Sequence, residues 1–467
     1  MYFAQHYLDC LSQASYLIGD ETTGRAVIVD PRRDVQDYLD DAAEHGLTIE
    51  GVIMTHFHAD FLAGHLEMTE ATGAWIGYGD RAQADYPVRH LGDGERIELG
   101  GTQGVALEIM HTPGHTPESI SVLVYEHADD EVAYAVLTGD ALFIGDVGRP
   151  DLLASLGATA DELGAMLYDS VQRKLMGLPD EVRVFPAHGA GSACGKNLST
   201  EKQSTIGEQR RFNYACRPMT EEQFVAIVTE GQPSAPDYFV YDAVLNRQQR
   251  QTYSATPAPE LDLDAALAEV EQGAILLDAR ESIEFAAGHL PRSLSIPLDG
   301  RFAETAGMML DPDDRIVVIA PDGHASEVVT RLARIGFDRV VGQLPGVESV
   351  LIAMDPALVG HASRLTPAAF DDAVAALGSN AFLLDVRNAG EIASGFLPGS
   401  VNIPLAELRR RIDEVPRDRP VIVNCAGGWR SAVAASYLRS QGFGDVSDIL
   451  GGYDAWHALR TPEGVRG

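Results

Sequence analysis

The sequence is poor in the residues that mark secreted, nucleic-acid-binding and membrane-spanning proteins. Four cysteines in 467 residues are too few for a disulfide scaffold, so we expect a reduced, cytoplasmic protein. Lysine occurs only three times, and 35 Lys+Arg against 69 Asp+Glu leave a formal net charge of −34. Such a surface repels phosphate polymers and anionic lipids, so we expect no nucleic-acid and no membrane partner. No apolar run reaches the roughly 18 residues needed to span a bilayer.

The length of the chain predicts several domains. At about 150 residues per domain, the 467 residues correspond to roughly three. Two proline-containing stretches, 232–236 and 256–259, flank a polar segment, Asn246–Arg250, that is typical of a connector. We therefore expect three domains, at residues 1–255, 260–355 and 363–467.

An internal repeat occupies the second half of the chain. The segment that begins at Leu277 and ends at Leu298 recurs from Leu384 to Leu405, with each matched residue shifted by 107 positions. Each copy alternates short apolar runs with helical stretches, which is typical of a small α/β domain with a parallel sheet. The predicted fold class of the whole chain is therefore α/β and multidomain.

Histidines and aspartates follow the ends of expected strands four times in the first domain. One example is the stretch from His56 to Asp60, which comes directly after the apolar run Val52–Met54. Side chains placed just past strand ends can converge on a single ion, so the pattern predicts a metal site. The candidate ligands are His56, His58, Asp60, His115, Asp140 and His188.

These residues resemble the motif of the metallo-β-lactamase superfamily, in which His-x-His-x-Asp-His and a later His, Asp and His supply two adjacent metal sites. The resemblance implies an αββα sandwich over residues 1 to about 230. Phe61 departs from the motif, because the binuclear hydrolases carry a histidine there and phenylalanine cannot bind a metal. His65 is a disfavoured replacement ligand, one helical turn from Phe61.

The departure at Phe61 favours a mononuclear centre. Two imidazoles and one carboxylate, from His56, His115 and Asp140, form the facial set that leaves open positions on Fe(II), so we expect one Fe(II) per chain. The remaining donors then lie next to the metal or form a vestigial second site; they are His58, Asp60 and His188.

Open positions on ferrous iron suit O₂ and a sulfur ligand bound side by side. The first domain is accordingly similar to the persulfide dioxygenases, in the variety fused to rhodaneses, a resemblance that also rests on residues 189–213. It implies a low-molecular-weight thiol persulfide as substrate, O₂ as co-substrate, sulfite as product, and a homo-oligomer. Candidates for holding the thiol carrier are the cations Lys196, Lys202, Arg210 and Arg211, with ordinary surface charge as the alternative.

The other cysteines of the chain carry weaker predictions. Cys194 lies in the stretch that resembles the rhodanese-fused dioxygenases, and it is either a buried small residue or an auxiliary persulfide site. Cys10 and Cys216 are expected in the core.

The last domain carries a cysteine loop between an apolar strand and a helix. The loop consists of Cys425, Ala426, Gly427, Gly428, Trp429, Arg430 and Ser431. Backbone N–H groups and a helix N-terminus aimed at one point stabilise a thiolate, and Arg430 adds a positive charge. The spacer of four residues between Cys425 and Arg430 is one shorter than in Cys-dependent phosphatases, and the tighter ring suits a sulfane sulfur.

This loop resembles the rhodanese sulfurtransferases. The resemblance implies that Cys425 carries a persulfide and exchanges sulfur with sulfite and thiosulfate, in a direction that the sequence does not set. The middle copy of the repeat has Pro321–Ser326 at this place, with neither cysteine nor arginine, so we expect it to be catalytically silent.

The sequence thus predicts an iron-dependent persulfide dioxygenase joined to a silent and an active rhodanese. Two alternatives stay open. One is a thioester hydrolase resembling glyoxalase II, with two zinc ions, against which Phe61 argues. The other is a sulfur carrier in which Cys425 passes persulfide to a partner protein and the metal is structural.

Overall fold

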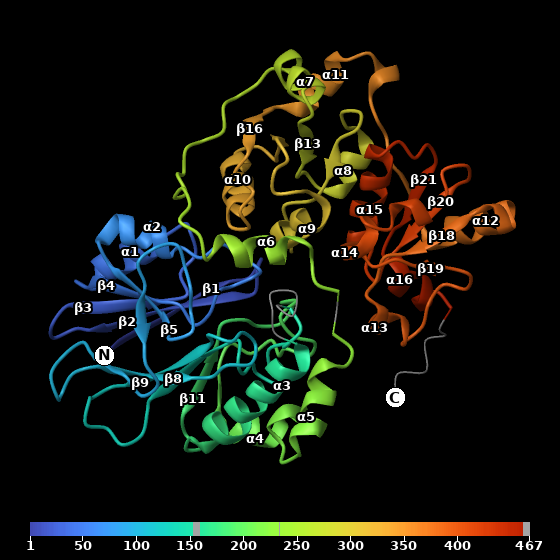
Figure 1. The fold of residues 1–467 in the computed structure, drawn as a ribbon. Helices are drawn as coiled ribbons and strands as arrows, with labels where there is room; N and C mark the ends of the chain where they lie inside the picture. The colour runs from blue at the N-terminus through green and yellow to red at the C-terminus, as the bar shows by residue number, and fades with distance from the viewer. Residues whose placement is uncertain (153–158, 233, 461–467) are drawn as a thin grey trace. The chain divides into compact units, whose positions relative to one another are not determined.

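Two mixed β-sheets form the N-terminal part of the chain in a computed structural model that describes residues 1–152, 159–232 and 234–460 (Figure 1). The strand orders are β1-β2-β3-β4-β5-β6 and β12-β11-β10-β9-β8-β7. The first sheet contains β1 (Tyr2–Leu8), β2 (Gln13–Asp20), β3 (Arg25–Val29), β4 (Thr48–Ile53), β5 (Trp75–Gly79) and β6 (Arg89–Leu91). The second contains β7 (Arg96–Glu98), β8 (Ala106–His111), β9 (Ile120–Tyr125), β10 (Ala135–Gly139), β11 (Arg183–Pro186) and β12 (Ser204–Thr205).

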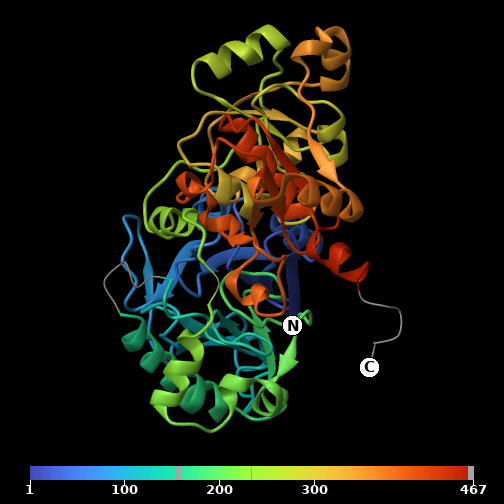
Figure 2. The ribbon, with the colours of Figure 1, turned by 90° about the vertical axis from the view of Figure 1, so that its right-hand side faces the viewer.

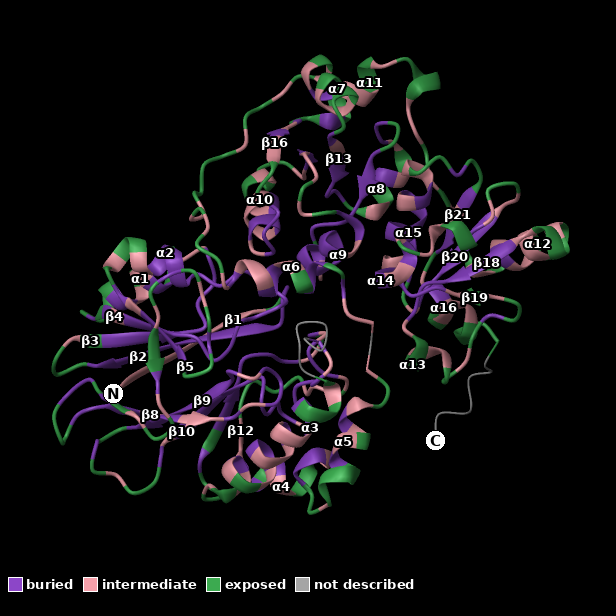
Figure 3. Cartoon of the chain, viewed as in Figure 1, coloured by how far each residue is buried: buried purple, intermediate pink, exposed green. Residues whose placement is uncertain are grey.

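The facing sides of these two sheets share one apolar core. Val27 and Ile53 of the first sheet and Leu107, Val122 and Leu137 of the second belong to a single buried cluster. Strands that are buried on both faces lose the polar alternation of exposed strands, which is why the runs around residues 26–29 and 135–137 are uniformly apolar. Figure 3 shows these central strands as buried.

Helices cover the outer faces of both sheets (Figures 1 and 2). α1 (Gln36–Glu44) and α2 (His65–Thr72) pack against β4. On the other side, Leu167 of α3 (Ala160–Tyr168) and Phe224 of α5 (Glu221–Thr229) join Val136 and Val184 of the second sheet in one cluster. α4 (Ile206–Phe212) and α6 (Tyr238–Leu245) complete this part of the chain. The αββα sandwich implied by the sequence is confirmed.

The chain divides by its contacts into Met1–Ser254, together with Ala333–Gly336, and a C-terminal unit made of the remaining residues. The C-terminal unit holds two sheets, ordered β14-β13-β15-β16 and β17-β21-β20-β18-β19, and every strand pair in them is parallel. The α/β class with parallel sheets is therefore confirmed. Residues 461–467 of the third predicted domain lie outside the described residues.

The elements of this unit follow the repeat. The first copy contains α7 (Leu263–Glu271), β13 (Ile275–Asp278), α8 (Ser282–Ala287), β14 (Leu294–Ser295), α9 (Phe302–Met309), β15 (Ile316–Ile319), α10 (Ala325–Ala333), β16 (Val340–Gln343) and α11 (Val347–Ala353). The second contains β17 (Ser363–Leu365), α12 (Pro367–Leu377), β18 (Phe382–Asp385), α13 (Ala389–Ile392), β19 (Val401–Asn402), α14 (Leu405–Leu408), β20 (Val421–Asn424), α15 (Trp429–Ser440), β21 (Val446–Ile449) and α16 (Gly452–Ala458).

A buried ion pair recurs at the same place in both copies. Arg280 donates to Asp278 at 2.6 Å and to the carbonyl of Gly288 at 3.1 Å. In the second copy, Arg387 donates to Asp385 at 2.7 Å and to the carbonyl of Gly395 at 2.9 Å. The pair closes the loop after the first strand of each copy, so its presence in the copy without a cysteine reflects folding and not catalysis.

No helix within the described stretches is long and apolar enough to cross a membrane.

Removing one member of such a pair leaves the other charge buried. Asp278 is fully buried and Arg280 is 3% exposed, so Asp278→Ala is expected to lower the free energy of unfolding of the C-terminal unit by about 3 kcal/mol. Urea unfolding measures the change. Asp313→Ala, which removes a partner that is 94% exposed, is the control and should change stability by less than about 1 kcal/mol. Equal effects of the two substitutions would contradict this role.

Candidate metal centre and cysteine loop

Four strand ends bring the predicted metal donors together. His56 and His58 follow β4, His115 follows β8, Asp140 follows β10, and His188 follows β11. The ligand atoms of His56, His115 and Asp140 lie within 4.8 Å of one another, as do those of His58, Asp60 and His188. All six residues are buried. The structure therefore brings the complete predicted set together as two adjacent trios, which are in contact through Asp140 and His188.

The first trio consists of His56, His115 and Asp140. Nε2 of His56 lies 3.8 Å, and Nε2 of His115 lies 3.5 Å, from Oδ2 of Asp140. Oδ2 of Asp140 has no hydrogen-bond partner among the described residues. An acidic oxygen that is buried without a donor is costly, so this atom marks the place where a cation would be held.

Hydrogen bonds on the far side of each ring fix which nitrogen faces the trio. The Thr55 hydroxyl donates to Asp30 at 2.7 Å, so it accepts from Nδ1 of His56 at 2.9 Å. Nδ1 of His115 lies 3.0 Å from the carbonyl of Arg149, which can only accept. Both rings therefore carry their proton on Nδ1 and turn the Nε2 lone pair inwards, as metal-binding histidines do.

Burial keeps both imidazoles neutral. It is the largest influence on the pKa of His56 and on that of His115, and it lowers both below the usual value of 6.5. Three lone-pair atoms thus face one another with no proton between them, in a buried site. Two imidazoles and one carboxylate fit a divalent transition metal, and the chemistry of this donor set is that of a mononuclear site with open positions.

The second trio is held together by its own charges. Nδ1 of His188 lies 2.7 Å from Oδ1 of Asp140, and Nε2 lies 2.8 Å from Oδ2 of Asp60. Burial opposes the charged ring, but the two carboxylates raise the pKa of His188 well above its usual value. Oδ1 of Asp60 has no hydrogen-bond partner among the described residues, so this trio also keeps an acceptor that a cation could use.

Phe61 packs beside this second trio. Its side chain is completely buried, and its ring centroid lies 4.4 Å from that of His58 and 6.4 Å from that of His188. Nε2 of His58 lies 3.1 Å from Oδ1 of Asp30. An apolar ring therefore lies close to two of the three donors of this trio, at the sequence position where the binuclear motif has a histidine.

His65 does not replace the missing ligand. None of the donor clusters found among the described residues includes it. Its ring packs at 4.8 Å from that of Tyr86, and neither of its nitrogens has a hydrogen-bond partner in the part of the chain described. Burial lowers the pKa of His65 to about 3, with a further contribution from Arg250.

Cys194 lies next to the place where the two trios meet. Its sulfur is within 4.8 Å of ligand atoms of Asp140 and His188, and its side chain is 1% exposed. Burial, and then Asp60 and Asp140, raise the pKa of the thiol well above its usual value. Cys194 is therefore a buried neutral thiol, which agrees with the first of the two roles considered for it. Cys10 and Cys216 are buried as well.

Some of the cations predicted to bind the thiol carrier already make hydrogen bonds or ion pairs to other groups of the chain. Lys196 donates to the carbonyls of Ile227 and Glu230 at 2.6 and 2.8 Å. Arg210 binds Asp180 and the carbonyls of Met176 and Leu178. Lys202 lies over the Tyr7 ring and Arg211 over the Phe212 ring. Lys196 and Arg210 could hold a substrate carboxylate only by giving up these bonds.

The cysteine loop connects β20 to the N-terminus of α15. Cys425 is 1% exposed, and its sulfur accepts a hydrogen bond from the Gly428 N–H at 3.1 Å and lies 3.4 Å from Oγ of Ser431. Gly428 has φ +90°, a conformation that favours glycine. The backbone thus turns an N–H group and a helix N-terminus towards the sulfur, as the sequence predicts.

The start of α16 fixes this loop from behind. The N–H groups of Tyr453 and Asp454 donate to the carbonyls of Cys425 and Ala426 at 2.7 and 3.1 Å. Gly452 makes the approach feasible, since a Cβ there would lie 2.3 Å from the Cys425 carbonyl oxygen. Gly452, the first residue of α16, is therefore part of the sulfur site.

Arg430 does not present a free positive charge to the loop. Its guanidinium makes two bonds of 2.7 Å to the carboxylate of Glu391. The positive charge expected of Arg430 is thus shared, because an anion entering the loop would share Arg430 with Glu391. The sequence shows Glu391 in the repeat, but nothing in its spacing gives it this partner.

The middle copy lacks the sulfur chemistry. Ala320 directly follows β15, where Cys425 directly follows β20, and α10 begins at Ala325. Pro321 to His324 form the turn between them. No nucleophile occupies this loop, in agreement with the silent role expected for it.

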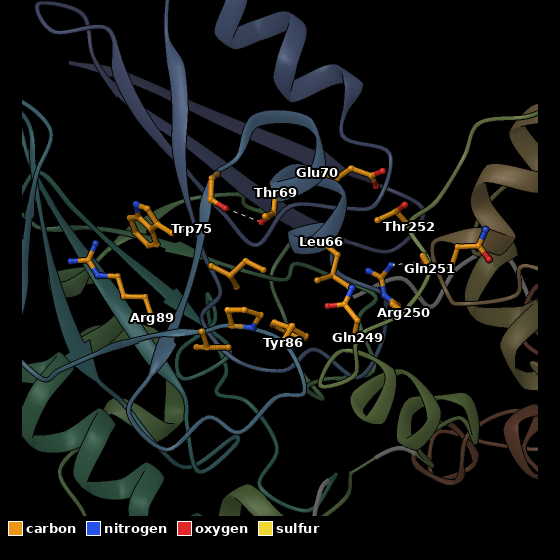
Figure 4. A pocket seen from close by; sticks show the side chains of 14 residues that line it. Leu66, Thr69, Glu70, Trp75, Tyr86, Arg89, Gln249, Arg250, Gln251 and Thr252 are labelled. Carbon is orange, nitrogen blue, oxygen red and sulfur yellow. Dashed lines mark hydrogen bonds between the residues drawn. The ribbon is translucent and has the colours of Figure 1, made fainter.

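A cavity of about 740 Å³ lies beside α2 (Figure 4). None of the six predicted metal donors belongs to its described lining. Leu66, Trp75 and Tyr86 supply apolar walls, and Arg250 lies at the side formed by the chain that follows α6.

Both parts of the chain are similar to known protein families. The profile of the metallo-beta-lactamase superfamily matches residues 8–188, and that of the rhodanese-like domain matches residues 262–346 and 367–459. "Persulfide dioxygenase ETHE1, mitochondrial" of Bos taurus is 31% identical over 223 residues, which are 46% of this chain and 75% of the relative. The Homo sapiens protein of the same name matches with the same identity and coverage.

The chain belongs to the persulfide dioxygenase family of the metallo-β-lactamase superfamily, and two rhodanese-like domains follow. The crystal structure of a metallo-beta-lactamase from Staphylococcus aureus subsp. aureus COL is similar over 73% of this chain and 98% of its own, with 32% identity and a TM-score of 0.66. Both parts of this fusion thus belong to enzyme families, and the His/Asp cluster indicates a metal in the first.

The buried, unpartnered His65 gives the N-terminal unit a pH-dependent stability. Its pKa is about 3 in the fold and 6.5 when unfolded, so below pH 6.5 the unfolded chain gains a proton that the folded chain does not. Each pH unit below 6.5 then costs about 1.4 kcal/mol. Between pH 7 and pH 5, His65→Phe should reduce the loss of unfolding free energy by about 2 kcal/mol.

Urea unfolding at the two pH values measures this difference. His90→Asn is the matched control, because His90 is an exposed histidine on β6 of the same unit and its replacement should leave the pH dependence as it is. An unchanged pH dependence in His65→Phe would contradict the assignment of a neutral, buried imidazole.

Proposed function

We propose that the N-terminal unit oxidises the outer sulfur of a low-molecular-weight thiol persulfide with O₂ at a single Fe(II), and that Cys425 moves sulfane sulfur between persulfide, sulfite and thiosulfate. One observation carries the first half: the inward lone pairs of His56, His115 and Asp140 lie beside a second trio in which His188 already contacts two carboxylates and Phe61 packs against His58. The relatives named persulfide dioxygenases support the substrate class.

The donor set is suited to this chemistry. His56, His115 and Asp140 would hold the iron, and Fe(II) bound by two imidazoles and a carboxylate offers open positions to O₂ and to a sulfur ligand. Thr55 and the Arg149 carbonyl keep the two rings turned towards it. His58 and Asp60 lie next to the first trio, where they can hydrogen-bond to the reacting groups.

The cysteine loop supports the second half of the proposal. The Cys425 thiolate attacks the outer sulfur of a persulfide, the S–S bond breaks, and the thiolate of the carrier leaves with the bonding electron pair. Sulfite then attacks the outer sulfur of the Cys425 persulfide, which gives thiosulfate and restores the thiolate. The Gly428 N–H and the N-terminus of α15 stabilise the anionic sulfur in both steps.

The two sites should be separable by substitution. O₂ uptake, sulfite and thiosulfate are measured on the full chain after anaerobic loading with Fe(II) and addition of a small-thiol persulfide. Cys425→Ser is expected to abolish sulfane transfer and keep O₂ uptake, because it removes only the nucleophile. Asp140→Asn is the reciprocal control: it should lower O₂ uptake at least about 100-fold and keep sulfane transfer.

Three other outcomes would contradict the proposal. Loss of both activities in Cys425→Ser would show that the sites do not work separately. No iron-dependent O₂ uptake, together with two tightly bound zinc ions and thioester cleavage, would make the first unit a hydrolase like glyoxalase II. Sulfur transfer only to a protein acceptor would instead favour the carrier.

A further inference from the structure

The loop that carries the first metal donors has little regular structure of its own. Residues 56–62 lie between the end of β4 and the start of α2 and form neither helix nor strand, yet all of them are buried. Backbone carbonyls in such a loop lack the partners that a helix or sheet would give, and each one needs a donor from elsewhere. The source of those donors decides how firmly His58, Asp60 and Phe61 are held.

Asn246 supplies these hydrogen bonds. Its side-chain N–H₂ donates to the carbonyl of His58 at 2.8 Å and to the carbonyl of Phe61 at 2.8 Å. Its side-chain oxygen accepts from the Ala63 N–H at 2.9 Å. Asn246 is completely buried, so one amide spans the loop with both of its protons and its oxygen engaged.

Neighbours in sequence reinforce the same contact. The Tyr238 hydroxyl, from α6, donates to the carbonyl of Asp60 at 3.2 Å. The guanidinium of Arg250 donates to the carbonyl of Ala63 and to the carboxylate of Glu67 on α2. Tyr86 in turn donates to the carbonyl of Asn246 at 2.6 Å, which anchors the segment itself.

We propose that Asn246 is a positioning residue of the metal centre, acting through the backbone of residues 58–63. It lies 58 positions beyond the end of the matched superfamily segment at residue 188, in a stretch whose composition is typical of a connector. The amide fixes the turn that holds the Phe61 ring against His58. The same turn places His58 and Asp60 beside the trio of His56, His115 and Asp140. Carboxylate or alkyl side chains cannot do this, because neither offers two N–H donors to two carbonyls.

The inference rests on the proposed metal centre. Binding of Co(II) tests the inference without a measurement of enzyme activity. Co(II) is titrated into the metal-free full chain, and its affinity and visible absorption spectrum are recorded. Asn246→Asp, which keeps the size and removes both donors, and Asn246→Ala should bind Co(II) about tenfold or more weakly, with shifted ligand-field bands. Gln249→Ala, an exposed neighbour in the same segment, should match the unsubstituted chain in both readouts.

Tyr238→Phe provides a variant that removes one hydroxyl and almost no volume. It should shift the Co(II) spectrum in the same direction as the Asn246 variants, and it decides the matter if those variants fail to fold. The positioning role would be overturned if Asn246→Asp and Asn246→Ala bound Co(II) with the affinity and spectrum of the unsubstituted chain. If the two Asn246 variants do not fold, an unshifted Co(II) spectrum in Tyr238→Phe would overturn it. Failure of the unsubstituted chain to bind Co(II) would overturn the metal centre itself.

Discussion

The metal centre of the N-terminal unit depends on three lone pairs that are held face to face in a buried site. His56, His115 and Asp140 direct two ring nitrogens and one carboxylate oxygen at a common point, and no described donor separates them. Two imidazole lone pairs and a carboxylate that are buried together are costly unless a cation lies among them. The sandwich supports this arrangement by ending several strands of its two sheets at the same place.

The charges around this point are the basis for proposing one metal and not two. His188 joins Asp60 to Asp140 as an imidazolium, so two of the three acidic oxygens on that side are already satisfied. Phe61 fills the place of a further ligand. In the proposed centre, the one metal held by the first trio would lie next to His188 and the buried thiol of Cys194.

The sequence allows much of this to be predicted, because the informative signals are local. Donors after strand ends, the 107-residue repeat and the glycine-rich turn after Val421–Asn424 each depend on neighbours along the chain. The bond between Arg430 and Glu391 and that between Asn246 and the metal loop join residues 39 and up to 188 positions apart. No periodicity records such pairs. Asn246–Arg250 was therefore interpretable only as a connector, although it is part of the site.

The measurement that tests the central claim most directly is anomalous X-ray scattering at the iron edge from crystals of the Fe(II)-loaded chain. The account predicts one peak per chain, within coordination distance of His56, His115 and Asp140, and none between His58, Asp60 and His188. Two peaks of similar height, one in each trio, would contradict the single-metal centre and the role given to Phe61.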